Sequence, residues 1–182
     1  MTPAKASGAA NLLRLADRVS LACSGIALGA SGLVILAIVA MGAVDVIMGF
    51  TVNYPLPAAT NVAEEALPAA VFLAAGMVLR NRANIVVDVL CDHFRSRLKR
   101  ISAVIAALGT FVFFALLASG AWHLAVDSIS LNERAVAAVE FPIWPMKLGF
   151  AIGATIATFE ALRLLAIAAL SSPSHQVEGQ DT

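Results

Sequence analysis

Charged residues are scarce in this sequence, and long stretches contain none. Asp, Glu, Lys and Arg make up 13% of the 182 residues, whereas apolar residues make up 60%; soluble domains have about 25% and 45–50%. No charge occurs over 19–44 or over 101–126. Each run exceeds the roughly 20 residues that a helix needs to cross a hydrocarbon core about 30 Å thick. The scarcity of charge therefore excludes an ordinary soluble domain and predicts a membrane protein.

Residues that carry chemistry are scarce as well. The sequence has two cysteines, Cys23 and Cys91, and no cysteine pair on the outer side that could serve a thiol oxidase. Its three histidines fall at different levels, with His93 on the inner side, His123 near the outer end of the third span and His175 in the tail, so bis-histidine haem ligation is not expected. No glycine-rich phosphate loop, metal-ligand spacing or nucleophile triad is present. We therefore predict a protein that is not an enzyme and holds no cofactor or metal.

The apolar segments predict an all-α membrane domain over 19–170. Its four transmembrane helices are expected at about 19–44, 60–79, 101–126 and 143–170. Lys and Arg concentrate between the second and third spans, where six of the twelve lie: Arg80, Arg82, Arg95, Arg97, Lys99 and Arg100. Cytoplasmic loops carry the Lys and Arg excess, so both termini are expected inside, on a cytoplasmic segment 1–18 and a disordered tail 171–182. The sole Tyr and the two Trp residues, Tyr54, Trp122 and Trp144, fall near the predicted outer interface.

The basic connection also has a helical apolar pattern. Its apolar residues recur at helical spacing: Ile85, Val86, Val89, Leu90, Phe94, Leu98 and Ile101. This pattern predicts an amphipathic helix on the inner leaflet, with its basic residues near anionic lipid headgroups. Membrane lipids are thus expected partners. Positive-inside orientation accounts for the basic residues without nucleic acid.

Charged side chains at the ends of the spans are candidates for function. Glu64 and Glu65 open the second span and Lys147 lies near the start of the fourth, so a carboxylate of this pair could neutralise the ammonium. Glu160 and Arg163 are three residues apart and can pair along one helix face. Structural anchoring or pairing is the favoured interpretation, because a proton or ion relay needs an acidic residue nearer to mid-membrane.

Two glycine pairs have the spacing of close helix contacts in lipid. Gly25 and Gly29 lie in the first span, and Gly149 and Gly153 lie in the fourth. They predict either packing within this chain or a surface for a second protein.

One ordered set of residues resembles a known family. Glu65, Gly76, Arg80, Arg82 and the segment Asn84-Ile85-Val86-Val87-Asp88 resemble the signature of the DctQ-type small membrane subunit of tripartite ATP-independent periplasmic (TRAP) transporters. The segment Pro142-Ile143-Trp144-Pro145-Met146-Lys147, followed by Gly149, is similar to its fourth-span entry. Asn84 stands where the family usually has His, which favours hydrogen bonding at a helix entry.

The resemblance implies a non-catalytic transporter component of the bacterial inner membrane. Its partners would be a large TRAP membrane subunit, which holds the substrate and sodium sites, and a periplasmic solute-binding protein that captures an organic acid or related solute. The interface candidates are Glu64, Glu65, Arg80, Arg82, Asn84, Asp88, Trp144, Lys147, Gly149 and Gly153. Two alternatives stay open, the small subunit of a tricarboxylate-type tripartite system and a self-contained proton-coupled exporter.

Overall fold

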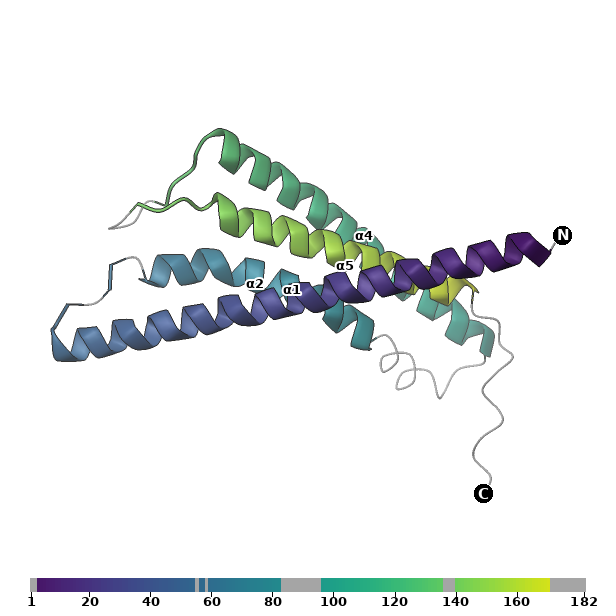
Figure 1. Cartoon of the computed structure of the whole chain (residues 1–182), viewed down its shortest axis with the longest axis horizontal. Helices are drawn as coiled ribbons and strands as arrows, with labels where there is room; N and C mark the ends of the chain where they lie inside the picture. Colours follow the sequence, from purple (N-terminus) through teal and green to yellow (C-terminus); the bar gives the residue numbers. More distant parts are fainter. Residues whose placement is uncertain (1–2, 55, 58, 83–95, 136–139, 171–182) are drawn as a thin grey trace, which may run out of the picture.

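Four long α-helices make up the structure, a computed structural model that describes residues 3–54, 56–57, 59–82, 96–135 and 140–170. Side chains are described within these ranges except at 3–16, 82, 96–100 and 170. The helices are α1 (Pro3–Thr51), α2 (Ala59–Arg82), α4 (Ser96–Ser130) and α5 (Trp144–Leu170) (Figure 1). Each is long and apolar enough to cross a membrane, as the sequence predicts, over Asp17–Thr51, Ala59–Asn81, Ile101–Ser130 and Trp144–Ala169.

Three details of the predicted architecture differ from the structure or lie outside it. The first helix begins at Pro3, so the segment expected to precede the span continues it without a break, and in Figure 1 its N-terminal end projects past the other helices. The expected amphipathic helix falls largely on residues 83–95, and the expected disordered tail on 171–182; both lie outside the described residues.

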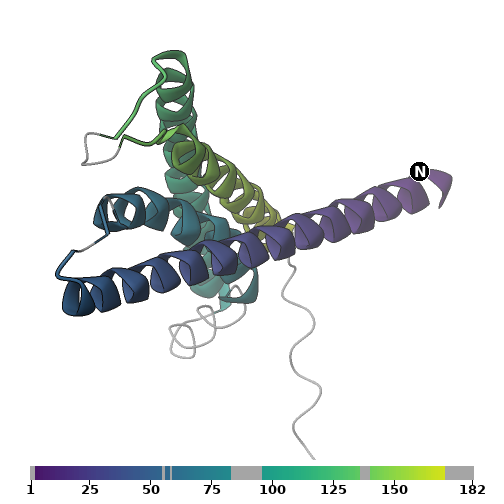
Figure 2. The ribbon, with the colours of Figure 1, turned by 60° about the vertical axis from the view of Figure 1, so that its left-hand side comes forward.

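The helices are arranged as a row in the order α1, α2, α5, α4, with extensive contact between each consecutive pair. Figure 2 shows α1 crossing obliquely in front of the others, while α4 and α5 rise away from it. An edge-to-face contact between Phe72 and Phe114, with ring centroids 6.4 Å apart, adds a link between α2 and α4. Consequently α2 and α5 are the central helices of the row.

Small residues bring α2 and α5 close together. A Cβ added at Gly153 would lie 2.5 Å from the backbone of Phe72 and Leu73, and one at Gly149 would lie 3.3 Å from Ala69 Cβ. Gly76 faces the same contact, where an added Cβ would be 2.8 Å from an Ile156 methyl group. Helices approach this closely in membranes when small residues line the contact. The glycine pair of the fourth span therefore packs within the chain, one of its two predicted uses.

The first-span glycines are placed differently. An added Cβ at Gly25 would only touch the end of Met77, 3.9 Å away, and one at Gly29 would meet nothing within 4 Å. The helix is held to α2 by Ser31 instead, whose buried hydroxyl donates to the Ala70 carbonyl at 2.6 Å.

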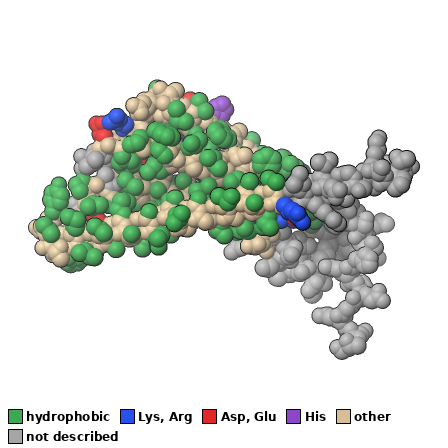
Figure 3. All heavy atoms as spheres, in the orientation of Figure 1, with side chains coloured by type: hydrophobic (Ala, Val, Ile, Leu, Met, Phe, Trp, Pro, Cys, Tyr) green, Lys and Arg blue, Asp and Glu red, His purple; other side chains and the backbone are tan. Residues whose placement is uncertain are grey.

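Most of the remaining surface is apolar. Large hydrophobic side chains are exposed along all four helices, and they dominate the face shown in Figure 3. Such a surface is too large for a soluble monomer. It fits helices surrounded by lipid or by a membrane partner.

Candidate functional site

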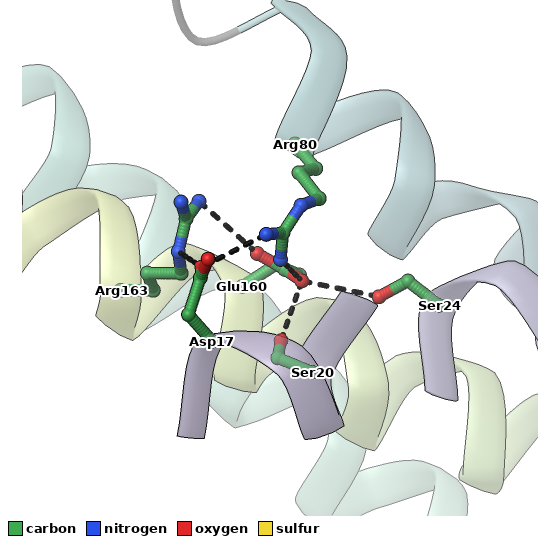
Figure 4. A network of polar contacts seen from close by, with 6 residues as sticks. All are labelled: Asp17, Ser20, Ser24, Arg80, Glu160 and Arg163. Carbon is green, nitrogen blue, oxygen red and sulfur yellow. Dashed lines mark hydrogen bonds and ion pairs between the residues drawn. The ribbon is translucent and has the colours of Figure 1, made fainter. Parts of the chain in front are cut away.

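Three helices meet around one partly buried arginine at the end of the row where α2 and α5 reach their C-termini. Arg80, on the last turn of α2, is only 12% exposed. Its guanidinium donates to Glu160 Oε1 of α5 at 3.0 Å and to Asp17 Oδ1 of α1 at 2.8 Å (Figure 4). The Arg80 side chain thus links α2 to both α1 and α5 through ion pairs.

Glu160 is the most enclosed member of this group. Its side chain is fully buried, and its Oε1 also accepts hydrogen bonds from Ser20 at 2.5 Å and Ser24 at 3.1 Å, both on α1. The second carboxylate oxygen has no hydrogen-bond partner among the described residues and lies 3.7 Å from Arg163 Nη1. A buried charge is tolerated when it is paired and hydrogen-bonded, and Glu160 meets both conditions.

Arg163 closes the group into a charge-balanced cluster. Its Nε lies 2.8 Å from Asp17 Oδ1, so Asp17 receives two arginines and links them. We call Asp17, Arg80, Glu160 and Arg163 the charge cluster. Two carboxylates and two guanidinium groups leave it without net charge, which suits a position at the edge of the hydrocarbon core.

Local sequence explains how α1 reaches the cluster. Asp17, Ser20 and Ser24 are spaced by three and four residues, so they lie on one face of α1, and Ser31 continues that face two turns later. A small residue lies opposite, since a Cβ added at Gly76 would be in van der Waals contact with the Ser24 hydroxyl at 3.4 Å. The polar face of an otherwise apolar helix is therefore turned toward α2 and α5.

Sequence reasoning found part of this cluster. The structure confirms the expected pairing of Glu160 with Arg163 along α5, and it places the candidate Arg80 at the centre. Asp17 was not predicted, because it was assigned to the cytoplasmic segment before the span. The available signal was the spacing of Asp17 with Ser20 and Ser24, three polar residues on one face at the start of an apolar run.

At the other end of the row, Lys147 of α5 has a different partner from the one predicted. Its ammonium donates to Glu133 Oε2, in the segment between α4 and α5. Neither Glu64, which is exposed, nor Glu65, which is partly buried, forms an ion pair with a described residue. The predicted pairing of Lys147 with a second-span glutamate is therefore wrong, because a nearer carboxylate comes from the adjoining loop.

The loop after α4 explains why. Asn132 adopts a left-handed conformation with φ 46°, which Asn tolerates better than most residues. This turns the chain back, so that Glu133 N–H donates to the Ser128 carbonyl at 3.0 Å and the Glu133 carbonyl accepts from Ile143 N–H at 3.3 Å. Glu133 is thereby held beside the first turn of α5, and the hydrogen bond from Lys147 lowers the pKa of its carboxyl.

Reversing the charge of Lys147 is expected to destabilise the chain more than removing it. Lys147→Glu would place a second carboxylate opposite Glu133, whereas Lys147→Ala removes only the attraction. The double change Glu133→Lys with Lys147→Glu should recover part of the loss. Thermal melting of the purified chain above pH 5 measures this, because the lowered pKa keeps the Glu133 carboxyl charged there and the pair weakens only as the pH falls through that lowered pKa.

Two outcomes would contradict this pairing. In one, the double change is no more stable than the two single changes added together. In the other, Glu65→Lys rescues Lys147→Glu as well as Glu133→Lys does.

The remaining sequence candidates are placed as follows. Trp144 is the first residue of α5 and Pro145 follows in its first turn, where a missing N–H is not needed. Arg82 is the last residue of α2, with a side chain outside the described set. Asn84 and Asp88 also lie outside the described residues.

The charge cluster holds α1, α2 and α5 together, and it offers few side chains for a chemical reaction. Its charged groups are used in pairing, and within the described part of the chain no group of three or more His, Cys, Asp or Glu residues could hold a metal ion. A cluster on three helices fixes their relative positions at one end, and the glycine contacts fix α2 against α5 along the middle. The result is a rigid four-helix row with an extensive apolar surface.

Comparison with known proteins agrees with these features. The family model described as the DctQ component of tripartite ATP-independent periplasmic transporters matches residues 38–170, a range that contains Arg80, Glu160, Arg163 and Lys147 but not Asp17. No curated protein and no solved structure matches the chain. The match covers most of the sequence and all of α2, α4 and α5, and the chain belongs to the DctQ component family of TRAP transporters.

Proposed function

We propose that this chain is a non-catalytic scaffold in a TRAP transporter of the bacterial inner membrane. Transporters of this kind also contain a large membrane subunit and a periplasmic solute-binding protein. In the proposed role the chain enlarges and anchors the static part of the large subunit and helps to dock the binding protein. The system would take up an organic acid or related solute with sodium.

The observation that carries this proposal is the charge cluster. Membrane transport sites use discontinuous helices and titratable or ion-coordinating groups near the bilayer midplane. Here all four spans are continuous helices, and the buried carboxylate of Glu160 is held by Arg80 and Arg163. Charges paired in this way join helices and do not carry ions. The same pairing removes Glu160 as the exchanging carboxylate of a self-contained proton-coupled exporter, and Glu64 and Glu65 lie within the first two turns of α2 and not at mid-span.

Reconstitution tests the proposed role. The purified chain alone in liposomes is expected to move no solute, because the residues that the structure describes form no transport site. Uptake should appear only when the large subunit is in the same membrane, the binding protein is outside and a sodium gradient is applied, and this chain should co-purify with the large subunit. Ion-coupled flux from the isolated chain would contradict the scaffold role.

We also propose that both termini are cytoplasmic, on the evidence of the Lys and Arg distribution. In intact cells and in a background without Cys23 and Cys91, single cysteines at Asn53 and Asn132 should react with a membrane-impermeant thiol reagent. A cysteine at Ser96, the first residue of α4, should react only after lysis. Labelling at Ser96 alone would reverse the orientation.

A further inference from the structure

The charge cluster reaches the surface of the bundle at two of its residues. The side chains of Asp17 and Arg163 are 46% and 32% exposed, whereas Glu160 is fully buried. Both exposed residues fall within candidate spans, Asp17–Thr51 and Trp144–Ala169. Exposed charge within a span is costly, because hydrocarbon offers no polar partner. The exposed part of the charge cluster therefore requires a polar group from outside the chain.

Both exposed side chains have hydrogen-bonding atoms to spare. Asp17 meets Arg80 and Arg163 through Oδ1 alone, so Oδ2 takes part in neither contact. Arg163 places Nε 2.8 Å from Asp17 and Nη1 3.7 Å from Glu160, so Nη2 takes part in neither contact (Figure 4). An acceptor and a donor that these contacts leave unused thus lie on directly paired side chains.

This pair of groups complements the headgroup of a zwitterionic phospholipid. A guanidinium binds phosphate well, and a carboxylate accepts hydrogen bonds from a primary ammonium group. The four residues of the charge cluster carry no net charge, so a headgroup without net charge matches them electrostatically. The next residue of α1, Arg18, is also exposed and adds a second guanidinium on the phosphate side.

Apolar side chains continue from the charged pair along both helices. Residues four and eleven positions away share a helix face with Asp17 on α1 and with Arg163 on α5. All four residues at these positions are exposed: Leu21, Leu28, Phe159 and Ile152. Because α1 starts and α5 ends at the charge cluster, both rows extend toward the opposite end of the bundle. Each is about 16 Å long, close to half of a hydrocarbon core about 30 Å thick, which is the length of the acyl chains of one leaflet.

The other ion pairs lack this combination of charge and apolar rows. At the opposite end of α5, Lys147 pairs with Glu133, but four residues along the helix Ala151 is fully buried. Arg134 and Glu140 form an exposed pair in the segment between α4 and α5, outside both helices. A headgroup at either pair would therefore have no exposed apolar row beside it of the kind that leads from Asp17 and Arg163.

We propose that Asp17 and Arg163 bind the headgroup of one phosphatidylethanolamine molecule. The Arg163 Nη2 donates to the lipid phosphate, and the Asp17 Oδ2 accepts from the lipid ammonium. The acyl chains lie along the exposed apolar rows of α1 and α5. With cytoplasmic termini, the lipid belongs to the inner leaflet. This site goes beyond the scaffold role and does not depend on it.

Native mass spectrometry of the purified full chain in detergent tests the site. The chain is titrated with phosphatidylethanolamine, phosphatidylcholine or phosphatidylglycerol, all with the same acyl chains. Phosphatidylethanolamine should bind about ten-fold more tightly than phosphatidylcholine, whose quaternary ammonium has no N–H, the effect of one hydrogen bond to a charged group. Soluble phosphoethanolamine at the same concentration should not displace the lipid, because it lacks acyl chains.

Variants separate the headgroup contact from the acyl-chain contact. Asp17→Asn should lower phosphatidylethanolamine binding to the level of phosphatidylcholine, whereas Glu140→Gln, at an exposed and paired carboxylate, should leave the preference unchanged. Phe159→Ser should weaken both lipids several-fold without changing their order. Its matched control is Phe113→Ser, at a phenylalanine of similar exposure on α4.

Four results would overturn the proposal. They are equal binding of phosphatidylethanolamine and phosphatidylcholine, tighter binding of phosphatidylglycerol, displacement of the lipid by phosphoethanolamine, and equal effects of Phe159→Ser and Phe113→Ser. A preference that survives Asp17→Asn would also contradict it. The melting temperature of each variant shows whether lost binding is lost folding. If Asp17→Asn does not fold, the wild-type lipid series and Phe159→Ser still decide.

Discussion

Arg80→Met is expected to destabilise the folded chain by about 3 kcal/mol, the lower end of the range for breaking a buried ion pair. The change leaves the buried carboxylate of Glu160 without its closest cation. Arg163 stays 3.7 Å from the other carboxylate oxygen, and this residual attraction limits the loss. Equilibrium unfolding with a denaturing detergent, followed by circular dichroism, measures the free energy of unfolding.

Replacing both Arg80 and Glu160 should destabilise the chain much less than replacing Arg80 alone. Arg80→Met combined with Glu160→Met leaves Asp17 and Arg163 paired at 2.8 Å, so the cluster stays neutral. Ser20 and Ser24 lose their acceptor but can donate to carbonyl groups of their own helix. We expect the double variant to lie within about 1 kcal/mol of the wild type, because apolar replacement of a buried ion pair is often close to neutral.

An exposed ion pair provides the control. Arg134 and Glu140 are 3.6 Å apart and both largely exposed, so Arg134→Met should cost less than about 1 kcal/mol. If Arg80→Met were as mild as Arg134→Met, the charge cluster would not hold the three helices together.

The second large effect is expected from Gly153→Ala. A single methyl group there would lie 2.5 Å from backbone atoms of Phe72 and Leu73, and backbone cannot rotate aside as a side chain can. The helices α2 and α5 must separate, and the contact of Gly149 with Ala69 loosens with them. Overpacking typically costs about 1–3 kcal/mol and sometimes more, and we expect about 3 kcal/mol because these two helices are the centre of the row.

The same substitution at an open glycine separates packing from helix propensity. Gly29→Ala meets nothing within 4 Å and should be neutral or stabilising by up to about 1 kcal/mol, since alanine favours helix more than glycine does. Detergent unfolding of both variants, with helix content measured beforehand, makes the comparison. Equal stability of the two variants would show that α2 and α5 are not in close backbone contact.

Much of the architecture could be predicted from the sequence. Length and lack of charge decide that a segment crosses a membrane, because every apolar residue in such a run prefers hydrocarbon whatever its neighbours are. Each of the four predicted segments therefore falls on a helix long and apolar enough to cross a membrane, and the motif around Arg80 and Trp144 led to the family that the comparison confirms. The pairing of Glu160 with Arg163 was also predictable, because helix geometry places residues three apart on one face.

Partners from different helices could not be predicted. Sequence gives the depth of Lys147 but not its neighbours, and Glu64, Glu65 and Glu133 could all reach a similar depth. The left-handed turn at Asn132 makes Glu133 the partner of Lys147. That turn is one of many conformations that the loop could adopt. Asp17 joined the charge cluster in the same way, because the packing angle of α1 brings its polar face to Arg80.

The sequence by itself thus determined which segments enter the membrane and which family the chain resembles, since both depend on residues taken in order along one helix. Only the tertiary structure decided which helices are neighbours, which charges neutralise each other and which glycines lie in close contact with another helix. Those outcomes depend on contacts between residues as far apart as Asp17 and Arg163. The partner of Trp122 belongs to the second group, because nothing in the order of residues says that its indole donates to Thr155 of α5 while the next side chain, His123, is exposed.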